Sequence, residues 1–245
     1  MGTEGPPVET PKRLSRGVAP KRSASRADSD ARLFLPQIAA FSKKVPIFAM
    51  PLHGHDKNAG LARHILDKAP PKFSLAGLSM GGIVAMEIMR QMPQRVARLA
   101  LIDTNPMTDA TDRAAIRQKQ IKQVLAGKLR SVMRDEMKPN YLAKGSERAG
   151  ILKLCMDMAE ALGPAVFTEQ SIALQYRRDQ CETLKAINVP TDIICGEDDR
   201  LCPVSRHEFM HDLIAGSTLS IISGAGHLPT LEQPKMTNRI LNGKV

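Results

Sequence analysis

Short apolar runs alternate with segments whose apolar residues recur at helical spacing along most of this 245-residue sequence. The apolar runs predict strands at 45–50, 73–76, 96–102, 190–195 and 218–222. The helical spacing predicts helices at 31–42, 59–68, 82–92 and 204–214, and a last helix that ends near residue 240. This alternation is typical of an α/β protein with a parallel sheet, helices on both faces and ligands at the carboxyl ends of the strands.

The pattern between residues 107 and 186 is wholly helical. It predicts helices near 109–126, 128–138, 146–161 and 164–178, broken at Pro139, Gly145 and Gly163-Pro164. An all-helical insertion between strands of a parallel sheet is typical of a lid. We therefore expect a core made of residues 29–106 and 187–245, with residues 107–186 as a helical cap.

Residues 1–28 are rich in Pro, Ser, Arg and Gly and contain hardly an apolar pair. Such a segment cannot bury enough surface to offset the entropy lost on ordering, so we expect it to be disordered. Part of it is strongly basic, with no acidic residue between Lys12, Arg13, Arg16, Lys21, Arg22 and Arg26. A basic contact arm and an organelle-targeting peptide are the alternative interpretations.

The formal net charge of +10 is compatible with binding to nucleic acid or to an acidic membrane. Beyond the basic N-terminal stretch, however, the charges are scattered at surface spacing, as between Arg113 and Arg134, without interleaved aromatic residues. This spacing favours solvated faces, so we expect neither nucleic acid nor a membrane as a partner.

The cysteines and the hydropathy pattern bear on the cellular compartment. None of the four cysteines has C-x-x-C spacing, and the sequence contains no run of 18 apolar residues. These features predict a reduced, cytoplasmic, soluble protein. Hydrophobic residues make up 42% of the chain, which is enough for a core, and the absence of Trp makes that core aliphatic and rich in Met.

The motif Gly77-Leu-Ser79-Met-Gly81 lies between an apolar strand and an apolar helix. A serine at the tip of such a tight turn needs glycines two positions before and after it. The turn would hold the Ser79 hydroxyl at a helix N-terminus, where free N–H groups favour developing negative charge. We interpret Ser79 as a nucleophile; a plain glycine-rich turn is the alternative.

A serine nucleophile needs a base, and the base needs an acid that orients it. His227 follows a predicted strand in a glycine-flanked loop, whereas His64, His207 and His211 fall inside predicted helices. His227 is therefore the preferred base.

The loop after strand 190–195 offers three candidate acids, Glu197, Asp198 and Asp199. We prefer Asp199, which falls at the turn into the next helix, over Asp198. Asp103, at the end of another strand, is kept in reserve.

Ser79, Asp199 and His227 follow one another in this order along the chain. Their surroundings resemble the nucleophile elbow, acid loop and histidine loop of α/β-hydrolase-fold serine hydrolases of the carboxylesterase-like branch. These three segments are residues 73–96, 196–203 and 224–234. The resemblance covers about residues 30–245. It implies that Ser79 attacks an ester carbonyl, that His227 transfers the proton and that Asp199 orients His227. It also implies a cap that shapes the acyl pocket, and no metal or organic cofactor.

The sequence departs from this family where the oxyanion hole should be. One donor would be the N–H of Met80, and the other should come from a loop that follows an earlier strand. The residues before the first predicted helix do not form such a loop. His53-Gly54 imitates it, but Gly54 precedes Ser79 by only 25 positions, where about 40 are needed.

The same departure predicts that the N-terminal strands, including a central one, are missing. Either strand 45–50 pairs directly with strand 73–77, or part of residues 1–28 fills the gap poorly. A truncated gene would give the same pattern.

Three functional hypotheses follow. The first is a serine hydrolase that cleaves a small carboxylic ester or related acyl substrate through an acyl-enzyme. The second is a catalytically weak or inactive binding protein of the same fold, or a truncated gene product, because loss of one oxyanion donor lowers turnover by about 10²–10³. The third is nucleic-acid binding through the basic segment. The substrate and the oligomeric state are not encoded in any motif that we recognise.

Overall fold

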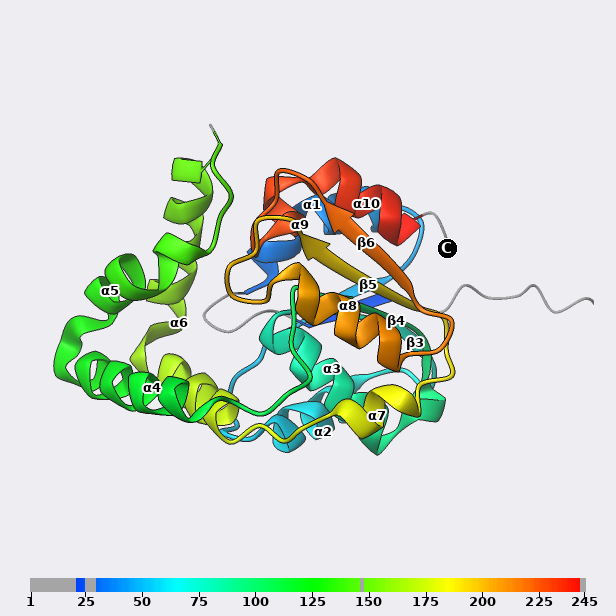
Figure 1. Cartoon of the computed structure of the whole chain (residues 1–245), viewed down its shortest axis with the longest axis horizontal. Helices are drawn as coiled ribbons and strands as arrows, with labels where there is room; N and C mark the ends of the chain where they lie inside the picture. The colour runs from blue at the N-terminus through cyan, green and yellow to red at the C-terminus, as the bar shows by residue number, and fades with distance from the viewer. Residues whose placement is uncertain (1–20, 25–29, 146–147, 243–245) are drawn as a thin grey trace, which may run out of the picture.

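The computed structural model describes residues 21–24, 30–145 and 148–242, which form a six-stranded, wholly parallel sheet with helices on both faces (Figure 1). The strand order is β2-β1-β3-β4-β5-β6. The strands are β1 (Lys21–Ala24), β2 (Ile47–Met50), β3 (Phe73–Leu78), β4 (Val96–Ile102), β5 (Thr191–Gly196) and β6 (Thr218–Ile222). The predicted α/β class, a mostly parallel sheet with helices on both faces, is thereby confirmed.

The central strands are almost continuously apolar because both of their faces are covered. All six residues of β5 are buried, and β3 and β4 each have at most two partly exposed positions. Because the strands are parallel and in fixed register, their carboxyl ends reach the same edge of the sheet. The loops that follow β3, β4, β5 and β6 therefore meet there.

Two apolar clusters lie on the two faces of the sheet. One face packs against α2 (Asn58–Lys68), α3 (Met80–Gln91), α7 (Cys181–Lys185) and α8 (Val204–Leu213). The other packs against the 3-10 turn Ala31–Phe34 with α1 (Leu35–Phe41) and against α9 (Pro229–Glu232) and α10 (Pro234–Asn242). The hydrophobic pattern of the sequence predicts helices in both layers, one layer on each face of the sheet. Their boundaries differ from the predictions by a few residues.

The strand β1 corrects the sequence analysis in one respect. It lies in the centre of the sheet, where Lys21 pairs with both Ile47 and Ser74 and Ala24 pairs with both Met50 and Gly77. Neither the prediction that the central strand is missing nor the expected disorder holds for these four residues. Hydrogen bonds to two neighbouring strands order a segment whose composition alone does not predict a strand. The rest of the segment 1–28 lies outside the described residues.

The described residues between β4 and β5 are mostly helical. Besides α7, they include α4 (Thr111–Gln123), α5 (Leu129–Ser131), α6 (Arg148–Gln175) and short π and 3-10 turns between Val124 and Asn140. The long helix α6 is interrupted at Gly163, which has a φ of 79° and is followed by Pro164. Figure 1 shows α4, α5 and α6 beside the sheet, on the side of its carboxyl edge.

The helical insertion contributes buried residues to both apolar clusters of the core. Tyr141, Leu142 and Met158 of the insertion contact the group of buried residues that includes Leu78 of β3 and Ile102 of β4. The base of the insertion is therefore anchored at the ends of the strands. Within the described residues, no helix combines the length and the apolar composition needed to cross a bilayer.

Candidate active site

The tight turn between β3 and α3 places Ser79 in a backbone conformation that is rare for a residue with a side chain, with φ 54° and ψ −116°. The turn closes so tightly that a Cβ at Gly77 would lie 2.2 Å from the Gly81 carbonyl oxygen. The Ser79 N–H donates to the Ile102 carbonyl at 2.8 Å, which ties the turn to β4. These contacts hold the Ser79 hydroxyl at the start of α3.

The structure brings Ser79, His227 and Asp199 together at the carboxyl edge of the sheet. The Nε2 atom of His227 lies 2.9 Å from Ser79 Oγ, and its Nδ1 atom lies 2.7 Å from Asp199 Oδ2. His227 is 1% exposed and Asp199 4% exposed. A proton on Nδ1 would be shared with the carboxylate and would leave the Nε2 lone pair directed at the hydroxyl.

The loop after β5 orients the Asp199 carboxylate. Its Oδ1 atom accepts hydrogen bonds from the N–H groups of Leu201 at 2.8 Å and Cys202 at 3.1 Å. Burial raises the pKa of Asp199. His227 opposes this effect through its charge and its hydrogen bond, and hydrogen bonds from the Asp103 carboxyl and the Cys202 N–H act in the same direction. Together they outweigh burial and lower the pKa of Asp199 to about 2. Asp199 is therefore ionised at neutral pH.

Asp103, the reserve acid, lies beside Asp199 and does not contact His227 in the described hydrogen bonds. It is fully buried, has a φ of 42°, and accepts the Gly196 N–H at 2.9 Å through Oδ1. Burial, and after it the Asp199 charge, raise the pKa of Asp103 well above its usual range. Its Oδ2 atom accepts no hydrogen bond from a described donor. A protonated Asp103 would use this oxygen to donate to Asp199.

The loop that carries His227 is held by Glu232, which the sequence analysis missed. Glu232 accepts hydrogen bonds from the N–H groups of Gly226, Leu228 and Ala143 at 2.8 to 3.0 Å. The His227 N–H donates to the Tyr141 carbonyl at 2.7 Å. Tyr141 and Ala143 belong to the helical insertion, so the insertion and the histidine loop are joined at this point.

A second supporting group lies behind the elbow. Thr104 donates through Oγ1 to the Ser79 carbonyl at 2.7 Å, and its N–H donates to His207 Nε2 at 3.2 Å. Burial lowers the pKa of His207 to about 4, so its ring is neutral and Nδ1–H donates to the Pro203 carbonyl. His207 lies inside a predicted helix and is therefore expected to be an ordinary surface or packing residue; only the tertiary contact with Thr104 identifies its role.

The two candidate contributors to the oxyanion hole have different surroundings in the structure. Met80 is the first residue of α3, where backbone N–H groups lack intrahelical acceptors. The Gly54 N–H donates to Glu169 Oε2 of α6 at 2.8 Å, so in this structure it is engaged by a carboxylate. The loop that follows β1 comprises residues 25–29 and lies outside the described residues.

A cavity of about 310 Å³ opens over Ser79 and His227. It is also lined by Arg113, Ile116, Arg117 and Gln120 of α4, with further contributions from Glu136, Met137, Asn140, Tyr141, Leu174, Arg177, Leu201 and Cys202. Its size suits a small organic molecule. The reactive hydroxyl and an extended binding surface therefore share one cavity.

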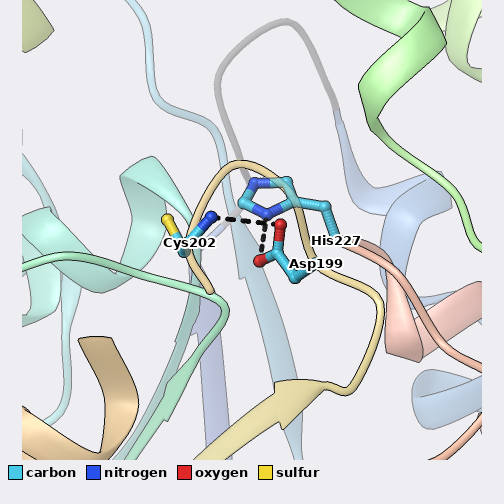
Figure 2. Close-up of side chains that lie close together, drawn as sticks. All are labelled: Asp199, Cys202 and His227. Atoms are coloured by element: carbon cyan, nitrogen blue, oxygen red, sulfur yellow. Dashed lines mark hydrogen bonds and ion pairs between the residues drawn. The ribbon is translucent and has the colours of Figure 1, made fainter. Parts of the chain in front are cut away.

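Only one group of three potential metal ligands occurs among the described residues, formed by Asp199, Cys202 and His227, whose ligand atoms lie within 4.8 Å of one another (Figure 2). The carboxylate and the imidazole are already joined at 2.7 Å. Burial raises the pKa of the Cys202 thiol above its usual range, which favours the thiol over the metal-binding thiolate. The donor set fits a proton relay better than a metal site.

Sequence comparison shows relatives along most of the chain. A family profile described as "Alpha/beta hydrolase family" matches residues 10–240. The pimeloyl-[acyl-carrier protein] methyl ester esterase of Klebsiella pneumoniae is 26% identical over 71% of this chain and 70% of its own length. Monoacylglycerol lipase ABHD6 of Bos taurus is 24% identical over 72% of this chain and 55% of its own length. The chain spans only 52% to 65% of the length of several curated relatives it matches.

Structural comparison shows the same fold in solved proteins. A thermophilic esterase from Thermogutta terrifontis superposes with a TM-score of 0.83 at 23% identity, over 93% of this chain and 89% of its own. The enol-lactonase from Burkholderia xenovorans LB400 superposes with a TM-score of 0.82 at 19% identity, over 94% and 92% of the two chains. At these identities the likeness establishes the fold alone.

Proposed function

The chain belongs to the alpha/beta hydrolase family, and from this premise we propose that it is a serine hydrolase that cleaves a small carboxylic ester or related acyl compound. The observation that carries the proposal is the unbroken hydrogen-bonded series from Ser79 through His227 to Asp199 at the floor of the cavity. The named relatives hydrolyse a methyl ester and a monoacylglycerol, which supports an ester as the substrate class.

In the first step Ser79 Oγ attacks the ester carbonyl carbon while His227 Nε2, 2.9 Å away, takes the hydroxyl proton. The ionised Asp199 stabilises the imidazolium that forms and keeps its Nδ1–H directed at the carboxylate. Collapse of the tetrahedral intermediate expels the alcohol, which receives the proton from His227. The product of this half-reaction is an ester between Ser79 and the acyl group.

In the second step water replaces the alcohol. His227 Nε2 takes a proton from water as its oxygen attacks the acyl carbon, and then returns the proton to Ser79 Oγ. The carboxylic acid leaves and the free enzyme is restored. Each step uses the same three side chains, which explains why their mutual distances must stay close to hydrogen-bonding values.

The negative charge on the carbonyl oxygen would be met by the Met80 N–H and by the positive end of α3. The sequence before Asp30 lacks the loop that supplies the second donor in this family. This departure favours a second candidate, a binding protein of the same fold with weak or no turnover. Loss of one donor costs about 10²–10³ in turnover, so the two candidates differ in rate by a measurable factor.

We propose further that the segment 107–186 is a cap that shapes the substrate pocket, because α4 and the residues around Tyr141 line the cavity. The partner is a small molecule. Cytoplasmic location is proposed on the four cysteines, all of which are free.

Labelling with a fluorophosphonate probe tests the nucleophile. We expect the wild-type protein and the control Ser205→Ala, whose serine is exposed on α8, to be labelled. We expect Ser79→Ala to remain unlabelled. Equal labelling of the wild type and Ser79→Ala would remove Ser79 as the nucleophile.

Turnover of p-nitrophenyl acetate separates the two candidates. A serine hydrolase should exceed the Ser79→Ala background by on the order of 10⁴-fold or more. Labelling without turnover above this background would instead identify the weak or inactive binding protein.

A further inference from the structure

The wall of the cavity that faces the catalytic residues carries a cluster of cations. Arg113, Ile116, Arg117 and Gln120 are spaced at i, i+3, i+4 and i+7 and therefore occupy one face of α4, and all four line the cavity. Arg177, just beyond the end of α6, joins them. Among the described lining residues, Glu136 is the one carboxylate on this wall.

Most of these charges are partly neutralised within the protein. Asp109 pairs with Arg117 at 2.7 Å and with Arg177 at 3.0 Å, so a single carboxylate serves two guanidinium groups. Glu136 accepts a hydrogen bond from Gln120 at 3.2 Å. After these pairings, the wall still has an excess of positive charge.

Arg113 is the cation with unused donors. Its guanidinium makes no hydrogen bond or ion pair with any described residue, and only its backbone N–H is engaged, by Asp112. Arg177 is buried, and burial lowers the pKa of its guanidinium in spite of the nearby Asp109. A partly desolvated cationic wall attracts an anion more strongly than a solvated one because the local dielectric constant is lower.

A solvated helix face is the alternative explanation of an exposed arginine such as Arg113. Two observations argue against it here. Arg113 lines the same cavity as Ser79. Two further arginines, Arg117 and Arg177, also line that cavity and share the single carboxylate of Asp109. By contrast Lys119 of the same helix is exposed and does not line the cavity.

We propose that the substrate of this site carries, besides the scissile ester, an anionic carboxylate or phosphate group that binds Arg113 on α4. The planar guanidinium suits either oxyanion, which it can bind with two parallel hydrogen bonds. The inference rests on the proposed hydrolase function and names the substrate class of that site.

Three matched esters test this proposal. They are the mono-p-nitrophenyl ester of adipic acid, its neutral analogue in which the free carboxyl is a carboxamide, and the p-nitrophenyl ester of 5-phosphonopentanoic acid. All three release the same alcohol and differ only in the distal group, so their kcat/KM ratios isolate recognition of that group. A hydrogen bond to a charged group is typically strong enough for a preference on the order of tenfold for an anionic ester.

Arg113→Gln should reduce this preference, measured within the variant as the ratio of kcat/KM for the anionic ester to kcat/KM for the neutral ester, to about one. The control Lys119→Gln removes a positive charge from the same helix without altering the cavity wall, and it should preserve the preference. The ratio of the carboxylate ester to the phosphonate ester identifies which oxyanion the site prefers.

The outcomes separate this proposal from the one on which it rests. If fluorophosphonate labels Ser79 but neither anionic ester is preferred over the neutral one, the anionic substrate class is wrong. If the preference survives in Arg113→Gln, the assignment of the anionic group to Arg113 is wrong. If Ser79 is not labelled and none of the esters is cleaved, the hydrolase function itself fails. Protection of Ser79 from labelling by free adipate, but not by adipamide, gives an independent readout should turnover be slow.

Discussion

The carboxyl edge of the sheet and the wall formed by the helical insertion face each other across one cavity, but they are built differently. At the sheet edge His227 and Asp199 are almost fully buried and hydrogen-bonded on both sides. On the wall, Arg113 is exposed and Ile116 is 52% exposed. Groups that keep a distance of 2.7 to 2.9 Å therefore lie in the buried region, and the groups that we propose to select a ligand lie in the more exposed one.

The difference follows from secondary structure. Neighbouring parallel strands fix each other's ends through their hydrogen-bond register, and the loops at those ends inherit this precision. The insertion has no such ladder, and its helices are interrupted at Gly127 and at Gly163-Pro164. We therefore expect substitutions at the sheet edge to alter the rate for every substrate, and substitutions on the wall to alter the choice of substrate.

The largest effect should follow Asp199→Asn. The amide can donate to His227 Nδ1, which would move the ring proton to Nε2 and remove the base from Ser79. In a comparable triad this change lowers kcat by about 10⁴, and we expect a loss of this order for neutral and anionic esters alike. Steady-state kinetics on both ester classes provide the measurement.

Asp198→Asn is the matched control for this change, because Asp198 is the exposed neighbour of Asp199. It should leave turnover within about twofold of wild type, as expected for a surface substitution. Near wild-type turnover of a folded Asp199→Asn protein would show that Asp199 is not part of the proton relay. It would also show that the sheet edge does not control the rate as we expect.

An intermediate effect should follow Glu232→Gln, which tests the hydrogen bonds that connect the histidine loop with the helical insertion. The carboxylate accepts N–H groups from both the histidine loop and Ala143 of the insertion, and an amide nitrogen in place of one oxygen cannot accept them. A small displacement of His227 should lower kcat/KM by about tenfold to a hundredfold. The rate of fluorophosphonate labelling should fall by a similar factor.

Glu208→Gln, an exposed position on α8, is the control for loss of a carboxylate. If Glu232→Gln changes only the preference between anionic and neutral esters, with labelling rates unaltered, Glu232 belongs functionally to the wall rather than to the histidine loop.

The smallest effect on activity should follow Asp103→Asn. An amide can donate to Asp199 as a protonated carboxyl does, and its oxygen can still accept the Gly196 N–H. We expect turnover within about threefold of wild type. A much larger loss would show that the charged form of Asp103 is needed.

The same variant should change how stability depends on pH. The pKa of Asp103 is raised in the folded state, so as pH rises above about 3.9 the unfolded chain loses this proton first and the wild type loses stability. The amide that replaces the carboxyl in Asp103→Asn carries no such proton. The unfolding free energy of the variant, relative to wild type, should therefore rise by on the order of 1 kcal/mol per pH unit until the folded pKa is reached. Thermal unfolding between about pH 4 and 7 measures this difference, and a deficit that grows with pH would contradict it.

Much of the architecture could be predicted from local pattern because the signals are local. The strand Val96–Ile102 and the helix over 59–68 follow from apolar periodicity. The Ser79 turn follows from two glycines, and the choice of His227 over His207 follows from the elements on which they lie. The strand β1 could not be predicted in this way, because its order comes from the two strands that flank it.

By itself the sequence determined the order of strands and helices, the turn that presents Ser79 and the loops that carry Asp199 and His227. Only the tertiary structure decided that Glu232 and Thr104 support these loops, that Asp103 shares the buried site with Asp199, and that one face of α4 lines the cavity. Periodicity and turn preferences act over a few residues, whereas a hydrogen bond or a pKa shift depends on groups that folding brings together from distant parts of the chain.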